Sequence, residues 1–140
     1  RIDIMLWRDS VGGLSHDHAI LIENKSNEAS DQLNQIYRYW HEQIYMRNNP
    51  DTDYGSPEIR SRFKLIYLPV DDSKQPAAHS LTRPANLKPS DPHHEKVPLE
   101  LKLIPIPRLL TIWREAAAKI PPGNSRLRTF LKFYDEHWNR

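Results

Sequence analysis

One apolar run constrains the fold of this chain more than any other feature. The segment His18–Lys25 reads His-Ala-Ile-Leu-Ile-Glu-Asn-Lys, and its centre, Ala19–Ile22, is apolar at every position. Because strand side chains alternate between the two faces of a sheet, such a run is buried on both faces, which indicates an interior strand. The chain must therefore supply further strands on either side of this segment.

The other patterns predict partner strands and covering helices. Strands are expected at 1–8, 18–25, 62–70 and 99–106, and helices at 31–46, 107–119 and 125–138. Gly12-Gly13 marks a turn, which makes the first two strands an antiparallel hairpin. Ser30 is the expected N-cap of the first helix, whose core stripe is Leu33, Ile36, Tyr37, Trp40 and Ile44. This order predicts an α/β fold with a mixed sheet flanked by helices.

Two further segments are expected to be loops. Residues 51–60 are polar, and residues 71–98 contain five prolines with four acids against four bases. A loop as long as 71–98 is either mobile or functional, and we favour a mobile loop. All 140 residues are assigned to one domain, since domains most often run to about 100–150 residues. The chain opens on Arg1 in mid-strand rather than on Met, so we expect it to be a fragment of a larger protein.

Composition excludes several classes of protein. The formal charge is +2 and there is no cysteine, which removes disulfide scaffolds, thiolate zinc sites and cysteine nucleophiles. No apolar run approaches the length of about 18 residues that a membrane helix needs. These observations predict a cytoplasmic protein without a membrane partner.

The residues that carry chemistry are concentrated near the start of the chain. Glu23 and Lys25 leave the same face of their strand, at a point where two charges are costly unless they are paired, solvated at the strand end or bound to a metal. The hairpin would bring Asp3 toward Glu23. Two carboxylates form a hard oxygen site suited to Mg²⁺, with Mn²⁺ as a substitute. A lysine beside such a site can orient a nucleophilic water or stabilise negative charge on a phosphate.

The helix that follows is expected to present polar side chains to the same region. Gln32 and Gln35 are spaced i and i+3, and Tyr39 lies four residues beyond Gln35, which places all three on one helix face. Glutamines at the start of such a helix can hold a water or contact a backbone phosphate.

Taken in order, these motifs resemble the PD-(D/E)XK nuclease superfamily. The chain is most similar to the branch with an Arg-Ile-Asp strand, a Glu-Asn-Lys strand and an Asp-Gln-x-x-Gln-x-x-x-Tyr helix, which correspond here to residues 1–3, 23–25 and 31–39. The resemblance implies a restriction-endonuclease-like mixed sheet flanked by helices. The first helix and first strand of the family core are not found in this sequence.

The resemblance also implies a function and a set of site residues. The catalytic residues would be Asp3, Glu23, Lys25 and Gln35. The metal ligands would be Asp3, Glu23 and the carbonyl of Asn24, and the substrate-binding residues would be Gln32 and Tyr39. The implied activity is Mg²⁺-dependent hydrolysis of phosphodiester bonds, with DNA as the favoured substrate, in prokaryotic defence or DNA processing. Nucleic acid is the expected partner, with a homo-oligomer or other protein subunits as further options.

Four alternatives remain open at this point. The domain can be a nuclease-like module that no longer cuts and serves in nucleic-acid binding or assembly. The two carboxylates can instead hydrolyse another substrate such as a glycoside, although Lys25 argues against it. His16 and His18 have the spacing of a zinc pair without an apparent third ligand. The basic segment 108–140 is either a phosphate-contacting surface or, as we favour, a solvated helix face.

Overall fold

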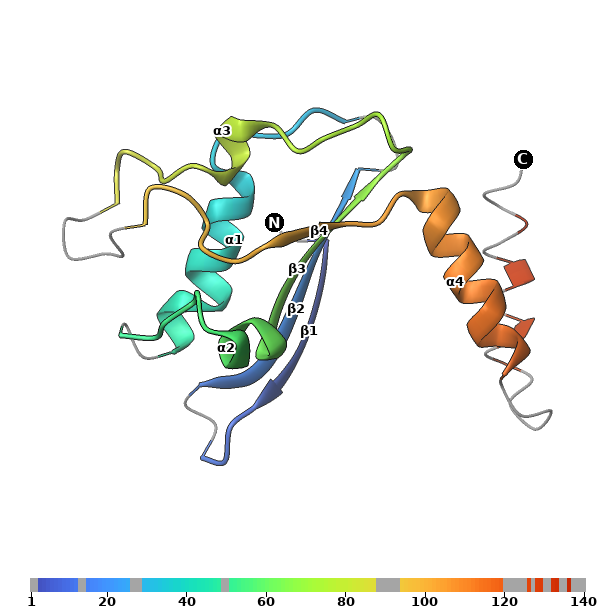
Figure 1. The fold of residues 1–140 in the computed structure, drawn as a ribbon, viewed down its shortest axis with the longest axis horizontal. Helices are drawn as coiled ribbons and strands as arrows, with labels where there is room; N and C mark the ends of the chain where they lie inside the picture. Colours follow the sequence, from blue (N-terminus) through green and yellow to red (C-terminus); the bar gives the residue numbers. More distant parts are fainter. Residues whose placement is uncertain are drawn as a thin grey trace.

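A four-stranded mixed sheet forms the centre of the molecule (Figure 1). The computed structural model describes residues 3–12, 15–25, 29–48, 51–87 and 94–119, together with 126, 128, 129, 132, 133 and 136. The strands, which lie side by side in chain order, are β1 (Ile4–Asp9), β2 (His16–Lys25), β3 (Phe63–Pro69) and β4 (Leu101–Leu103). β1 is antiparallel to β2, whereas β2, β3 and β4 are parallel. The α/β fold class, the hairpin and the interior position of β2 are therefore confirmed.

Helices cover both faces of this sheet. The helical elements are α1 (Gln35–Gln43), the 3-10 turn η1 (Tyr45–Arg47), α2 (Pro57–Arg62), α3 (Ala78–Leu81) and α4 (Ile106–Ala118). The larger core packs the odd-numbered positions of β2 and β3 against α1, whose buried Tyr37 and Trp40 meet edge to face. A smaller core on the opposite face joins Leu68 to Ile106 and Leu110 of α4. No helix in the described part of the chain has the length and hydropathy that crossing a bilayer requires.

The first helix begins later than the sequence predicts. α1 starts at Gln35 rather than at Asp31, and Ser30 is not its N-cap. The reason is that Asn34 adopts a left-handed backbone (φ 56°) and donates its backbone N–H to the carbonyl of His79. This connection holds residues 31–34 in a loop against the segment around α3. Leu33, expected in the core, is consequently 64% exposed, while the other four residues of the predicted stripe are buried.

The two predicted loops contain structure that the sequence analysis missed. α2 occupies the end of the 51–60 segment, where Ser56 caps Ile59 N–H and Pro57 provides the first helical residue. In the described parts of 71–98, α3 packs against α1, and Thr82 pairs with Lys96. Proline removes a donor without preventing the rest of a segment from packing.

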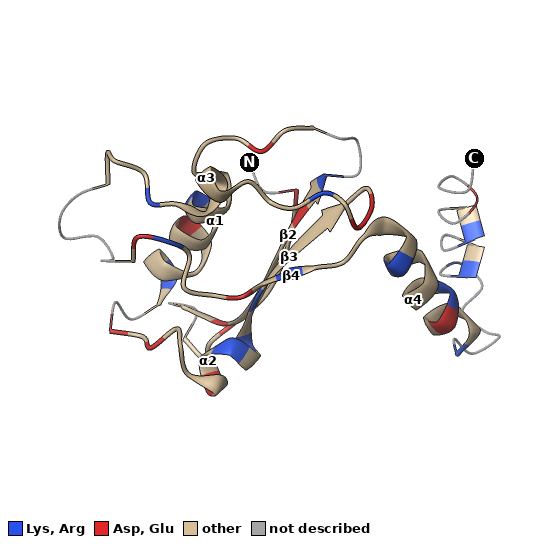
Figure 2. Cartoon of the chain, turned by 45° about the horizontal axis from the view of Figure 1, so that its top comes forward, with Lys and Arg blue, Asp and Glu red and all other residues tan. Residues whose placement is uncertain are grey.

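The last elements agree with the prediction only in part. β4 spans Leu101–Leu103, shorter than the predicted 99–106, since Pro105 already begins the turn into α4. α4 itself matches the predicted 107–119 helix within one residue at each end. The core positions predicted for a helix at 125–138 lie outside the described residues. Figure 2 shows where Lys and Arg lie along α4 and beyond it. In the part of the C-terminal segment that the structure describes, these residues are exposed, which accords with a solvated face.

Candidate active site

β2 carries two charged residues into the larger core at its carboxyl end. Glu23 and Lys25 are each only 5% exposed, on the same face as the core residues Ala19 and Leu21. Burial of ionised groups is stabilising only when each has close partners. The positions that the sequence analysis selected are therefore not a solvated strand end.

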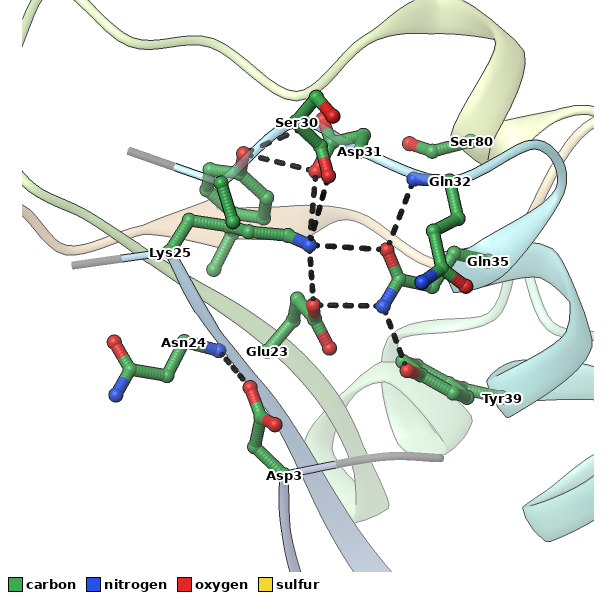
Figure 3. Close-up of polar contacts among 12 residues, drawn as sticks. Asp3, Glu23, Asn24, Lys25, Ser30, Asp31, Gln32, Gln35, Tyr39 and Ser80 are labelled. Carbon is green, nitrogen blue, oxygen red and sulfur yellow. Dashed lines mark hydrogen bonds and ion pairs between the residues drawn. The ribbon is translucent and has the colours of Figure 1, made fainter. Parts of the chain in front are cut away.

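The partners of these two charges come from each other and from α1 (Figure 3). Lys25 Nζ lies 2.9 Å from Glu23 Oε1 and donates to Gln35 Oε1 at 3.1 Å. Gln35 Nε2 in turn donates to Glu23 Oε1 at 2.8 Å, which closes a three-residue ring of polar contacts. The ring places a carboxylate, an ammonium group and an amide in contact with one another. The first two lie at the carboxyl end of β2, and the amide lies in the first turn of α1.

Gln35 is oriented by four hydrogen bonds. Its amide oxygen accepts from Lys25 Nζ and from the backbone N–H of Gln32, and its amide nitrogen donates to Glu23 and to the Tyr39 hydroxyl at 2.8 Å. An amide offers two acceptor lone pairs and two N–H donors, so its capacity is used in full. Because Lys25 can only donate, the amide cannot turn over, and the side chain is locked toward Glu23.

Asp31 adds a second buried carboxylate that the sequence analysis placed at a helix start. Its side chain is 3% exposed and lies 3.7 Å from Lys25 Nζ. It accepts hydrogen bonds from the Tyr67 hydroxyl at 3.1 Å and from the backbone N–H of Ala77 at 2.6 Å. Asp31 therefore joins β3 and the segment before α3 to the lysine, and Tyr67 enters the site with it.

Asp3 stands at the outer edge of this cluster. It immediately precedes β1, whose first residue, Ile4, pairs with Ile22, so Asp3 lies one step beyond that pair and beside Glu23. Its Oδ2 accepts the backbone N–H of Asn24 at 2.7 Å (Figure 3). The hairpin thus brings Asp3 to the Glu-Asn-Lys segment as predicted, with its carboxylate exposed rather than buried.

Burial sets the proton affinity of the groups at the centre of the site. Desolvation raises the pKa of Glu23 above the ordinary 4.5, the negative charge of Asp3 raises it further, and Lys25 opposes both effects. Burial also raises the pKa of Tyr39 to about 12, so its phenol stays protonated throughout the physiological range. Tyr39 therefore acts as a neutral hydrogen-bonding group.

The oxygens of Glu23 and Asp3 suit a divalent cation. Glu23 Oε2 is buried and makes no hydrogen bond of ordinary length to any described residue, and the Tyr39 hydroxyl lies near enough to lower the pKa of Glu23. Asp3 supplies a second, exposed carboxylate beside it. Mg²⁺ is commonly held by one or two carboxylates and keeps several waters, so a pair is sufficient. No group of three His, Asp or Glu residues in the described ranges is arranged to hold a metal, which leaves the His16–His18 zinc alternative without a third ligand.

Most of the predicted site residues converge, and two others join them. Glu23, Lys25, Gln35 and Tyr39 contact one another, and Asp3 meets Asn24. Gln32 lies before α1 rather than on its face and contacts Gln35 through its backbone N–H, so the predicted i, i+3 pair on one helix face is wrong. Asp31 and Tyr67 were missed as site residues. Asp31 is the first letter of the Asp-Gln-x-x-Gln motif, which was the available signal.

Comparison of this chain with protein-family models, with curated proteins and with solved structures found no match. The function of this chain is therefore inferred from the residues of the site itself.

Proposed function

We propose that this chain is a metal-dependent nuclease that hydrolyses phosphodiester bonds, with DNA as its favoured substrate, on a restriction-endonuclease-like version of the α/β fold. The observation that carries the proposal is the buried Glu23–Lys25–Gln35 ring, with the buried Oε2 of Glu23 and the Asp3 carboxylate beside it. The strand arrangement supports it, since an antiparallel β1–β2 pair followed by parallel strands presents these residues at one end of the sheet.

The residues of the site have separable roles in this proposal. Asp3 and Glu23, with the carbonyl of Asn24, would hold Mg²⁺ or Mn²⁺, which when bound supplies a Lewis acid and positive charge to the reacting phosphate. Lys25 places a positive N–H donor next to the same carboxylate, where it can orient a water and offset charge that develops on a phosphate oxygen. Gln35 fixes the side chains of Lys25 and Glu23 relative to each other through its amide.

Gln32, which is exposed, would contact the nucleic-acid strand at the rim of the site, whereas the buried Tyr39 would act on the substrate through Gln35. Tyr39 braces the Gln35 amide from α1, and Gln32 contributes its backbone N–H to the same amide. Both residues therefore help to position the Gln35 amide relative to the bound nucleic acid. Their effects on activity should be smaller than those of Lys25 or Glu23.

Supercoiled plasmid with Mg²⁺ provides the test. Wild-type protein should nick or linearise the plasmid, and EDTA should abolish the reaction. Lys25→Ala should lower the rate about 100-fold or more, as expected for loss of a charged group in the transition state. The matched control is Lys64→Ala, because Lys64 lies on β3 and is exposed. Asp3→Asn, an exposed position outside the strands, keeps the test valid if Lys25→Ala fails to fold. Equal rates in Lys25→Ala, Asp3→Asn and wild type would overturn the proposal.

One observation favours a second candidate, a nuclease-like module that binds nucleic acid without cutting it. Lys25 is engaged by Glu23, Gln35 and Asp31, which is also what a purely structural buried lysine would do. A silent module needs no cation at Asp3 and Glu23. Absence of both plasmid cleavage and Mn²⁺ binding by the wild-type protein would select this candidate.

A further inference from the structure

A second polar pocket lies at the opposite end of α1. Positions 35, 39 and 43 follow one another at intervals of four along α1, the spacing that keeps residues on one face of an α-helix, and position 47 ends the 3-10 turn η1 that follows. The first two belong to the candidate active site. Gln43 and Arg47 instead line a surface pocket of about 190 Å³, whose other walls are Met5, Trp7, Asp9 and His16.

His16 is the distinctive group in this pocket. It is 4% exposed, and its Nδ1 lies 2.8 Å from Asp9 Oδ1. Its Nε2 is buried and has no hydrogen-bond partner among the described residues. A carboxylate at Nδ1 fixes the ring and favours a proton there, so Nε2 is the nitrogen left to meet a ligand. A buried ring nitrogen without a partner costs free energy unless something occupies the pocket.

The pocket and the active site share one face of the sheet. Met5 pairs with Leu21 and Trp7 with Ala19, so β1 and β2 run continuously from the Glu23 end to the His16 end. α1 lies along the same strands (Figure 1). Six residue steps along β1 separate Asp9, the partner of His16, from Asp3 beside Glu23, which at about 3.3 Å per residue is roughly 20 Å. A stacked nucleic-acid strand rises about 3.4 Å per nucleotide, so about six nucleotides span that distance.

We propose that the His16 pocket binds a backbone phosphate of the nucleic-acid strand whose scissile phosphate lies at Glu23. This inference rests on the proposed function for its substrate class. The exposed Arg47 guanidinium is the cationic donor for the phosphate oxygens, and the Gln43 amide is a neutral donor beside it. His16 adds a third donor in the form of the ring that carries a proton on Nε2, and Asp9 holds that ring in place through Nδ1.

The exposed indole of Trp7 favours a strand over a free phosphate. Trp7 is 57% exposed and its ring centroid lies 6.0 Å from that of His16. Surfaces that bind single strands pair cationic groups with aromatic rings on which bases stack. A pocket for inorganic phosphate has no use for such a ring.

The test measures binding of a fluorescent oligothymidylate, longer than six nucleotides, by anisotropy in EDTA, where no cleavage takes place. Arg47→Gln and His16→Asn should each weaken binding about tenfold relative to wild type. Arg47→Gln should also reduce the slope of log K against log salt by about 0.7, the value for one phosphate contact on a single strand. Arg108→Gln, at an exposed position on α4, is the matched control and should change neither quantity. Because Arg47 is exposed, its variant keeps the test valid if His16→Asn does not fold.

A second arm follows the His16 ring resonances by NMR during titration with the oligonucleotide and with inorganic phosphate. Larger shifts with the oligonucleotide at equal concentration support a strand subsite. Saturation by inorganic phosphate alone, with oligonucleotide affinity unchanged in Arg47→Gln, would overturn the proposal in favour of a free anion. No shift with either ligand would overturn it in favour of a purely structural His16–Asp9 pair. Failure of plasmid cleavage with intact His16-dependent binding would instead count against the proposed nuclease function alone.

Discussion

The two ends of α1 lie on the same face of the sheet, but the charged groups near them differ in burial and in the number of their partners. At the amino end, Glu23 and Lys25 are buried and satisfied mainly by each other and by Gln35. At the carboxyl end, buried His16 has one charged partner, Asp9, which is half exposed, and the pocket around them stays open. The first end is acidic at its rim through Asp3, and the second is basic at its rim through Arg47.

The two arrangements suit different ligands and different roles. A closed ring of charges fixes side-chain positions before any ligand arrives, which is what a reacting centre requires. An open pocket with one unsatisfied nitrogen leaves the ligand to complete the hydrogen bonds. The contrast predicts that substitutions at the amino end disturb both folding and chemistry, whereas those at the carboxyl end mainly disturb binding.

The largest effect on stability is expected at Lys25. Lys25→Met leaves Glu23 buried without its cation, and removal of one partner of a buried ion pair costs about 3–5 kcal/mol in the free energy of unfolding. Urea denaturation measures this cost. Lys64→Met, at an exposed position on β3, should change it by less than about 0.5 kcal/mol. The double variant Glu23→Gln/Lys25→Met should recover part of the loss, and the same loss in the double as in the single variant would contradict the pairing.

A smaller loss of stability is expected at Asp31. Asp31→Ala removes the acceptor of Tyr67 Oη and of Ala77 N–H, and buried donors left without an acceptor cost about 1–3 kcal/mol. The matched control is Asp72→Ala, because Asp72 is exposed. Hydrogen exchange adds a local reading, since protection of the Ala77 amide should fall. Unchanged protection would show that the loop is held by other contacts.

The pH dependence of the amino end follows from Glu23. Its pKa is raised above 4.5 mainly by burial, so the folded chain holds this proton more tightly than the unfolded chain does. In metal-free protein, the tighter proton binding of Glu23 adds to the free energy of unfolding. This contribution is full below pH 4.5 and is lost as the pH rises through the raised pKa of Glu23. The affinity for a metal depends on pH in the opposite direction: it rises with pH, because the cation must displace the proton of Glu23.

The consequence is measurable as an acid limb in metal affinity. Affinity for Mn²⁺ should fall about tenfold for each pH unit below the raised pKa of Glu23, starting above pH 4.5. Isothermal calorimetry across the acidic range provides the curve, and Lys64→Met is expected to reproduce it. An acid limb centred below pH 4.5 would mean that Glu23 is not the group that titrates.

The smallest effect is expected at Tyr39. Tyr39→Phe removes an acceptor for Gln35 Nε2, and one neutral hydrogen bond contributes about 0.5–1.5 kcal/mol. Plasmid cleavage should slow a few-fold, with no change in its alkaline limb, because burial raises the pKa of Tyr39 to about 12. A shifted alkaline limb in the phenylalanine variant would show that the phenol titrates during the reaction.

The sequence predicted the amino end better than the carboxyl end for a physical reason. Glu23, Lys25, Gln35 and Tyr39 are close in sequence, and strand and helix periodicity places such neighbours on a common face. The partners of Asp31 lie 36 and 46 residues further along the chain, so no local pattern reveals them. The predicted start of α1 was wrong for the same reason, because the hydrogen bond between Asn34 and His79 overrides helix propensity.

The His16 pocket depends on tertiary structure even more strongly. Asp9 meets His16 only because the β1–β2 register shifts between Arg8 and Asp9. A β-bulge of this kind redirects side chains and leaves no reliable trace in hydrophobic alternation. α2 is the opposite case, because Ser56-Pro57 is a recognisable helix start that the polar composition of the segment obscured.

Two aspartates at opposite ends of β1 allow the most direct test of the difference between the two ends of α1. Asp3 precedes the strand near Glu23, Asp9 closes it near His16, and both are exposed. Calorimetric titration with Mn²⁺ should give one site in the wild-type protein, weakened at least tenfold in Asp3→Asn and unchanged in Asp9→Asn. Equal affinity in all three proteins, or no Mn²⁺ binding by the wild type, would contradict a cation site at the Glu23 end.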